Sequence, residues 1–563
     1  MIALLACVAP GELARGPHAL MQLDGAVFDA PFPRDSLRGS TVDLSTFPHD
    51  DNDFVLQVLD LLATAEGFGT TSPIHFPLST APSELPLEAF VLEDVDPASD
   101  EQGRTFPLLV DFQADAGPYG AENLLSLLPL QGLPLRPNTT YRAAITALDA
   151  DEEAFVPHPL CDGDVACTVF TTWDPTAELD ELLAEPLVLT EAPTSTLSYP
   201  TYDVLEGRVT AAVYQTGEPP YWSEGGGLSE AVDHHEEGRL IVTVPEGAAP
   251  ASGWPVAVFI RTGGGGEDPL LDRGIAPAAD EPAAPGTGPA VELAAAGFVG
   301  VQLDGPHGGV RNVSGSDEQF LIFNVANPAA MRGNIQQSAL ELRLLPALLA
   351  QLDLPLDLED PVLIGHSMGA TIAPLAAEAY GGLVLSGAGG SWIENIVHKQ
   401  SPLEVRPLAE AVLGYSDRTL HEHDPALGLL QWAGEGADPP VWAERVPEDV
   451  LMFQGIVDTY ILPDIANATS LSLALDLAGE ALDESVAWDD QSTYLSVAGL
   501  VGAEQVAFPV EHRALVQQAE DGLYDGHEVF FQTPEPRQQL QCFLASSRTG
   551  LAIIAAPGAC PDG

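Results

Sequence analysis

The pentapeptide Gly365-His366-Ser367-Met368-Gly369 is the part of the sequence best suited to chemistry. It follows an apolar run, Val362 to Ile364, that favours a buried strand, and it precedes the small-residue stretch ATIAPLAAEAY, which favours a helix. A strand-to-helix turn this tight admits only glycine at its two flanks and exposes the serine hydroxyl beyond the sheet. The helix N-terminus behind the serine favours developing negative charge. We therefore predict that Ser367 is a nucleophile.

A serine in this setting resembles the nucleophile elbow of the α/β-hydrolase superfamily, to which many serine esterases and lipases belong. The resemblance extends over most of the chain from about residue 198, and it implies that an acid and then a histidine follow the serine in chain order. Asp458, shortly after the apolar run DVLMF, matches the acid, and His527, in an Asp-Gly-His loop, matches the base. Asp464 and Glu448 are weaker candidates for the acid, and His512 is the rival for the base.

The same resemblance implies an oxyanion hole made by two backbone N–H groups. Met368, directly after the serine, would supply one group, and the loop RTGGGGEDP would supply the other through Gly263 or Gly264. Esterases and lipases often carry a histidine before these glycines, whereas this chain has Arg261-Thr262. The family mechanism is acyl transfer to water through an acyl-enzyme, and it requires no metal and no organic cofactor.

Two halves of the chain follow different patterns. From about 21 to 172, short β-rich runs separated by Pro, Gly and Asp predict a β-sandwich. The segments PFPRDSL, GFGTTSPI and LRPNTTYRAAI resemble the immunoglobulin-like N-terminal domain of bacterial lipases of the virulence factor type. From about 198 to 563, alternating strand-like and helix-like runs predict a mostly parallel sheet flanked by helices, the α/β-hydrolase fold. We expect a linker helix over 173–197.

An insertion between about 392 and 448 is rich in Leu, Trp and Pro. In α/β-hydrolases an insertion at this place is usually a cap or a lid. It contains Trp392, Trp432 and Trp442, which could line a substrate pocket, with buried packing inside the cap as the alternative. Trp392 is the candidate for substrate binding.

Five cysteines bear on the compartment of the protein. The spacings of Cys161 with Cys167 and of Cys542 with Cys560 do not fit a CxxC metal or redox motif, so two local disulfides are the simpler interpretation and indicate export. Cys7 is left over. Leu4-Leu5-Ala6-Cys7 resembles the lipobox of bacterial lipoproteins, although the charged region before it is missing. Residues 1–20 are therefore expected to be a truncated lipoprotein signal and linker, with membrane anchoring through a lipidated Cys7 or secretion as the outcomes.

The chain is strongly acidic, with 83 Asp and Glu against 20 Lys and Arg and a formal net charge of -63. Such a charge opposes binding to nucleic acid, which we exclude as a partner. The expected partner is a small-molecule or lipid ester, while the acyl chain length and the oligomeric state stay open. Two alternatives also stay open: a peptidase on the same fold, and a surface binding protein whose hydrolase domain is inactive.

Overall fold

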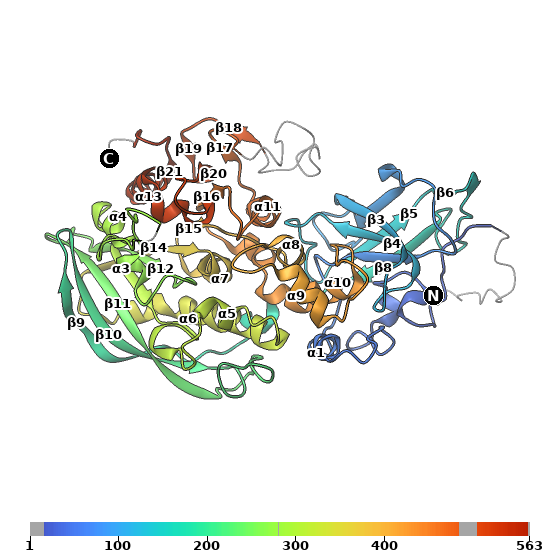
Figure 1. The fold of residues 1–563 in the computed structure, drawn as a ribbon, viewed down its shortest axis with the longest axis horizontal. Helices are drawn as coiled ribbons and strands as arrows, with labels where there is room; N and C mark the ends of the chain where they lie inside the picture. Colours follow the sequence, from blue (N-terminus) through green and yellow to red (C-terminus); the bar gives the residue numbers. More distant parts are fainter. Residues whose placement is uncertain (1–15, 280, 483–503, 561–563) are drawn as a thin grey trace.

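The computed structural model describes residues 16–279, 281–482 and 504–560, so Cys7 lies outside the described residues. Figure 1 shows a β-rich N-terminal part beside a larger part in which helices surround one sheet. Three cap helices lie between them: α8 (Trp392–His398), α9 (Val405–Val412) and α10 (Pro425–Gly434). No helix of the described ranges combines the length and the apolar character that a membrane span needs.

The larger part is built on an 11-stranded sheet with the order β18-β17-β20-β16-β15-β14-β12-β13-β11-β10-β9. The strands from β18 to β13 run parallel, whereas β11, β10 and β9 form an antiparallel edge. This confirms the predicted mostly parallel sheet. The strands are β9 (Val188–Ser198), β10 (Tyr202–Val213), β11 (His234–Pro245), β12 (Trp254–Phe259), β13 (Val299–Leu303), β14 (Leu356–His366), β15 (Gly382–Ser386), β16 (Asp449–Ile456), β17 (Leu477–Ala478), β18 (Gln505–Val506) and β20 (Arg513–Ala519).

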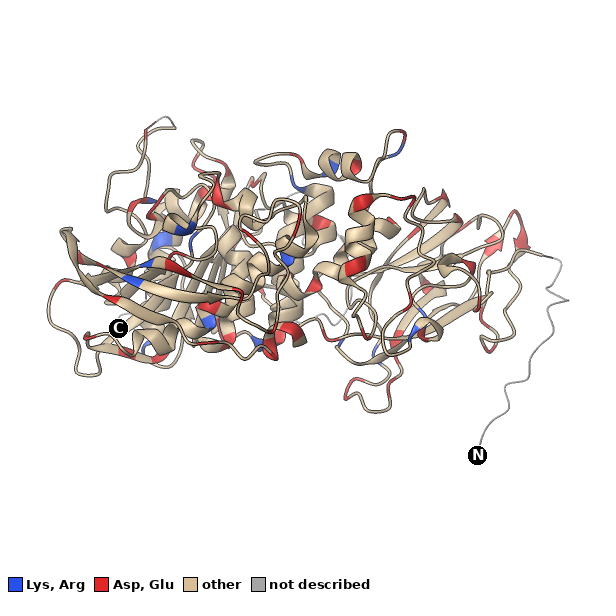
Figure 2. Ribbon diagram, turned by 90° about the horizontal axis from the view of Figure 1, so that it is seen from below, with Lys and Arg blue, Asp and Glu red and all other residues tan. Residues whose placement is uncertain are grey.

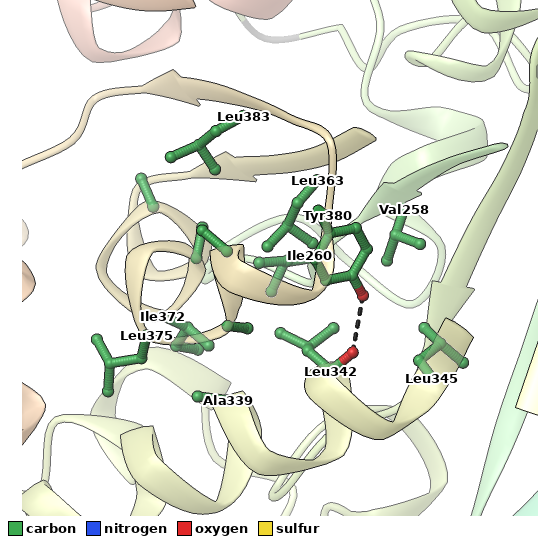
Figure 3. Packing of buried hydrophobic residues seen from close by; sticks show 14 of the residues in the cluster. Val258, Ile260, Ala339, Leu342, Leu345, Leu363, Ile372, Leu375, Tyr380 and Leu383 are labelled. Carbon is green, nitrogen blue, oxygen red and sulfur yellow. Dashed lines mark hydrogen bonds between the residues drawn. The ribbon is translucent and has the colours of Figure 1, made fainter. Parts of the chain in front are cut away.

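Helices cover both faces of this sheet, because the central strands carry apolar side chains on both sides. Along β14, Leu363 belongs to the core shared with helices α6 and α7, while Val362 and Ile364 belong to the core shared with α4 and α13. Figure 3 shows the first of these cores, in which the Tyr380 hydroxyl donates to the Leu342 carbonyl oxygen at 2.8 Å. The helices are α3 (Pro269–Asp272), α4 (Ala290–Ala295), α5 (Glu318–Ile322), α6 (Pro328–Leu349), α7 (Met368–Ala376), α11 (Pro463–Ser472), α12 (Val529–Gln532) and α13 (Pro534–Ser547).

The N-terminal part contains two three-stranded antiparallel sheets, β1-β4-β3 and β2-β5-β8, and the small pair β6-β7. The predicted β-rich runs are SPIHFPLS, EAFVLEDVD, TFPLLVDF, TTYRAAITAL and CTVFTTW, and they correspond to β1, β2, β3, β5 and β8. Strand β4 was missed because its leucines show no alternation with polar residues. An immunoglobulin-like sandwich stays a prediction. The elements are β1 (Ile74–Pro77), β2 (Phe90–Asp94), β3 (Leu108–Asp115), β4 (Glu122–Pro129), β5 (Thr140–Ile145), β6 (Asp149–Ala150), β7 (Glu153–Ala154), β8 (Ala166–Thr171) and α1 (Asp53–Leu61).

The linker helix expected over 173–197 is wrong for most of its length. Helix α2 spans only Ala177–Asp180, and β9 begins at Val188 and pairs with β10 at the edge of the large sheet. Pro193 and a row of exposed side chains hide the strand pattern in the sequence. An edge strand tolerates both, because one side of its backbone needs no partner.

The cap helices and the N-terminal sheets share one hydrophobic core. Phe68 of the N-terminal part packs on Trp432 of α10, with ring centroids 5.6 Å apart. The Tyr119 hydroxyl donates to the Leu413 carbonyl oxygen at 2.6 Å, and the Asn52 side chain donates to the Val412 carbonyl oxygen at 2.9 Å. The predicted insertion therefore packs against the N-terminal part, and its role as a cap stays a prediction.

Acidic residues occur along the chain in both parts of the molecule, as Figure 2 shows, rather than in a single segment. The structure joins Cys161 to Cys167 and Cys542 to Cys560, with Cα–Cα distances of 5.5 Å and 5.3 Å. The first pair closes the loop that leads into β8, and the second ties the chain after β21 (Ile553–Ile554) to α13.

Candidate active site

Ser367 occupies the sharp turn between β14 and α7. Its backbone has φ 53° and ψ -117°, a left-handed conformation that residues other than glycine rarely adopt. A Cβ atom at position 365 would lie 2.5 Å from the Gly369 carbonyl oxygen, so only glycine fits there. The strained turn therefore follows from the two glycines, and it leaves the Ser367 side chain half-buried at the carboxyl end of the sheet.

Asp458 and His527, predicted as acid and base, are brought together from two loops. Asp458 follows β16, His527 lies in the short turn η8 (Gly526–Glu528), and Asp458 Oδ2 is 2.9 Å from His527 Nδ1. Both side chains are buried. The other carboxylate oxygen accepts hydrogen bonds from the backbone N–H groups of Tyr460 at 2.7 Å and Ile461 at 2.8 Å. This arrangement directs the Nδ1–H of His527 to the carboxylate and leaves Nε2 able to accept a proton.

The rival residues lie elsewhere. Asp464 is 52% exposed and lies 3.7 Å from His398, whereas Glu448 is 76% exposed at the opposite end of β16. His512 hydrogen-bonds Asp449 at 2.7 Å, also at that opposite end. None of the three contacts the Asp458–His527 pair.

His527 lies against the serine turn. Its ring centroid is 4.8 Å from that of His366, the neighbour of Ser367. Gly387, with φ 52°, makes room for it, since a Cβ there would lie 2.7 Å from His527 Cε1. No hydrogen bond joins the Ser367 hydroxyl to His527 within the described part of the chain, in keeping with the loose catalytic contacts of enzymes without substrate.

Two residues that the sequence analysis missed hold the base in place. The Tyr460 ring stacks on the His527 ring, with centroids 4.6 Å apart and an interplanar angle of 13°. Asp525 accepts hydrogen bonds from the His527 backbone N–H at 2.9 Å and from the Thr459 hydroxyl at 2.6 Å, which links the two loops. Each lies two residues from a predicted triad member, and that spacing is the only sequence signal for them.

The proposed oxyanion loop follows β12 and runs beside the serine turn. A Cβ at Gly369 would lie 3.3 Å from the Arg261 carbonyl oxygen, and one at Gly263 would lie 2.6 Å from the Gln319 side chain. Met368 begins α7, so its N–H has no partner one turn earlier in that helix. The structure therefore brings Met368 and the start of the glycine loop to the same edge of the sheet. Gly264 lies farther along the loop, with open space at its Cβ position.

Arg261, which precedes the glycine loop, is buried inside the protein. Its guanidinium pairs with Asp304 at 3.3 Å and with Glu318 at 3.0 Å, and it donates to the carbonyl oxygens of Gly266 at 3.2 Å and of Glu267. Burial raises the pKa of Glu318 to about 6, even though Arg261 favours its charged form. Arg261 therefore stabilises the conformation of the glycine loop through hydrogen bonds to its backbone.

A cavity of about 380 Å³ opens beside Ser367 and Met368. Trp392 is part of its wall, whereas Trp432 and Trp442 are buried and do not contribute, so only one of the three candidate tryptophans lines the cavity. The apolar side chains of the wall come from the part built on the large sheet, from the cap helices and from the N-terminal α1. They include Phe54, Trp222, Phe320, Phe323, Met331, Trp392, Ile396, Val405, Leu408, Val412, Leu413, Leu420, Leu427, Leu430 and Ile461.

Lys399, the single lysine of the 563-residue sequence, also lines this cavity. Its Nζ donates to the Tyr460 carbonyl oxygen at 2.9 Å, on the loop that carries Asp458. Burial lowers its pKa to about 8, with the negative charge of Asp458 acting in the opposite direction. On the other side of the site, burial holds the pKa of His366 well below its usual value, so this ring is neutral.

No family model matches the sequence, and no match was found among curated proteins. Several solved structures are similar at low identity. The acetyl xylan esterase from Paenibacillus sp. R4 aligns with a TM-score of 0.39 and 13% identity, over 66% of this chain and 92% of that one. Acetyl xylan esterase 1 from Thermoanaerobacterium sp. JW/SL YS485 aligns with a TM-score of 0.34 and 16% identity, over 53% and 82%. The acylaminoacyl peptidase of Pyrococcus horikoshii gives 0.33 and 11%, over 87% and 55%.

Proposed function

We propose that the protein is a serine hydrolase that cleaves carboxylic esters with a substantial apolar group. The observation that carries this proposal is the buried Asp458–His527 hydrogen bond of 2.9 Å, next to a serine turn whose Ser367 faces an apolar cavity. The order of strands and the chain order serine, acid, histidine fit the α/β-hydrolase arrangement.

The reaction would proceed in two acyl-transfer steps. Ser367 Oγ attacks the ester carbonyl carbon while His527 Nε2 takes the hydroxyl proton, and the proton then passes to the leaving alcohol. Water, deprotonated by the same histidine, releases the acid from Ser367. Asp458 stabilises the imidazolium in both steps, and the N–H groups of Met368 and of Gly263 or Gly264 would stabilise the oxyanion.

The wall of the cavity favours apolar substrates over peptides. Its side chains are mostly aromatic or aliphatic, and burial of an acyl chain contributes about 0.8 kcal/mol per CH₂ group. The two disulfides support the further proposal that the protein is exported, and anchoring through a lipidated Cys7 belongs to that proposal.

The test is hydrolysis of p-nitrophenyl esters from acetate to palmitate by the wild type, by Ser367→Ala and by Ser314→Ala. Ser314 is an exposed loop serine and serves as the matched control. We expect the activity of the wild type to rise with acyl length. Ser367→Ala should lose at least about 10⁴-fold of this activity, whereas Ser314→Ala should keep the activity of the wild type. Turnover of peptide p-nitroanilides without ester turnover would replace the proposal with a peptidase, and inactivity on both would favour the binding-protein alternative.

A further inference from the structure

A cluster of possible metal ligands lies at the junction between the N-terminal part and the cap, away from the catalytic residues. Asp111 of β3 meets His421 and His423, which lie in the loop between α9 and α10, and their ligand atoms all lie within 4.8 Å of one another. We propose that these three side chains bind a divalent transition-metal ion of the zinc type. Two imidazoles and one carboxylate suit such an ion, whereas calcium and magnesium prefer an all-oxygen set.

The His423 ring gives an independent indication of a ligand. Its side chain is buried, with 8% of the residue exposed, and its Nε2 has no hydrogen-bond partner in the described part of the chain. A buried polar atom without a partner costs free energy, so such atoms usually have an ion or a water beside them. A metal bound at Nε2 would satisfy it.

Neighbouring side chains hold the cluster in position. Arg418 donates to the side-chain oxygen of Gln113 at 3.3 Å. The Gln113 side chain in turn contacts both Asp111 and His421.

A second cluster of possible metal ligands differs from the first in the charge of its histidine. Glu394, His398 and Glu422 also lie close together. Burial lowers the pKa of His398, but hydrogen bonds to the two glutamates and the charge of Asp464 outweigh burial and raise the pKa to about 10. His398 is therefore a cation near pH 7 and forms ion pairs, whereas Nε2 of His423 has no hydrogen-bond partner in the described part of the chain.

A metal here would tie β3 to the loop before α10. Asp111 and the two histidines are far apart in the sequence, so the sequence alone did not predict this site. The cap helices α9 and α10 line the catalytic cavity, through Leu408 and Leu427 among others. The ion would thus fix one wall of the cavity to the N-terminal part, independently of whether the proposed ester hydrolysis is correct.

The experiment is a titration of the full-length chain, first freed of metal with a chelator, with zinc chloride in a calorimeter and with cobalt chloride in a spectrophotometer. We expect one tight site, a visible cobalt spectrum typical of tetrahedral nitrogen and oxygen ligands, and a higher Tm with zinc. His423→Gln and Asp111→Asn should each weaken binding by more than the ~10–100-fold that changes outside the ligand shell produce.

The matched control is His235→Gln, because His235 is 52% exposed and pairs with Glu185 outside the cluster. It should bind zinc like the wild type. The proposal is overturned if the wild type shows only weak binding to many sites, or if both ligand variants bind zinc as the wild type does. Asp111 is only partly buried, so Asp111→Asn should fold normally, and far-UV circular dichroism checks this.

Discussion

The two sides of the catalytic cavity are built in different ways. On the sheet side, each residue of the proposed triad is fixed by short contacts or by a strained turn: Asp458 by two backbone N–H groups, His527 by Asp458 and Tyr460, and Ser367 by its glycines. On the cap side, the wall consists of apolar side chains that continue into the core of the N-terminal part. Directional contacts fix the residues of the proposed triad, whereas the packing of apolar side chains determines the shape of the cavity.

Under the proposed function, this difference predicts that the N-terminal part takes part in substrate selection. Phe54 of α1 lines the cavity directly, and hydrogen bonds from Asn52 and Tyr119 hold the end of α9. Changes on the sheet side should therefore abolish turnover of all substrates, while changes on the cap side should alter the preference among them or the stability of the assembly.

The largest effect is expected for Asp458→Asn. The imidazole would lose the carboxylate that fixes its tautomer and stabilises its charged form, so kcat should fall about 10⁴-fold for every ester. Asp464→Asn, six residues later and 52% exposed, is the control and should keep most of the activity. The kcat of both variants on one short-chain and one long-chain ester decides the matter, and equal losses in the two variants would refute the assignment.

Phe54→Ala should change selectivity. Removing an aromatic side chain from the wall of the cavity lowers the transition-state stabilisation of esters with long acyl chains. The ratio of kcat/KM for palmitate esters to kcat/KM for acetate esters should therefore fall about tenfold. Leu56→Ala on the outer side of the same helix is the control. An unchanged ratio in Phe54→Ala would show that the N-terminal part does not contact the substrate.

Glu435→Gln should loosen the contact between the cap and the N-terminal part. The buried carboxylate accepts hydrogen bonds from the backbone N–H groups of Thr70 and Thr71 and from the Trp173 indole N–H. An amide NH₂ group would face one of these donors, at an expected cost of about 1–3 kcal/mol in the free energy of unfolding. Chemical denaturation measures the change, with the exposed Glu404→Gln as control; equal stability of the two variants would count against this role.

The smallest effect is a change in pH dependence. Burial raises the pKa of Asp438 from 3.8 to about 7. Its neutral form is favoured in the folded protein, so its stabilising contribution is present below about pH 4 and is lost as the pH rises through 7. Asp438→Asn removes this pH dependence of stability. The loss of a carboxylate acceptor in the variant lowers the stability by an amount that does not change with pH. We expect the Tm of the variant, measured from pH 5 to 8, to fall less steeply than that of the wild type; parallel curves would contradict the assignment.

The sequence predicted the sheet side far better than the cap side. Ser367 lies in a local motif, and Asp458 and His527 each follow an apolar strand, so short stretches were enough to predict three candidates that the structure places near one another. The shared core of cap and N-terminal part, the contact of Phe54 with the cavity and the Asp111–His423 cluster join segments that are distant in the chain. No local pattern records such contacts, and β4 and β9 were missed because leucine runs and exposed edges lack alternation.

The single lysine has a practical consequence. Apart from the N-terminal amine, Lys399 carries the only alkyl amine of the chain, and its pKa of about 8 leaves a reactive fraction unprotonated in mildly alkaline buffer. Amine-directed dyes, cross-linkers and aldehyde resins would therefore react inside the cavity instead of over the surface. A fluorophore attached this way would report the filling of the cavity, and coupling to beads through lysine would place the attachment point in the cavity wall.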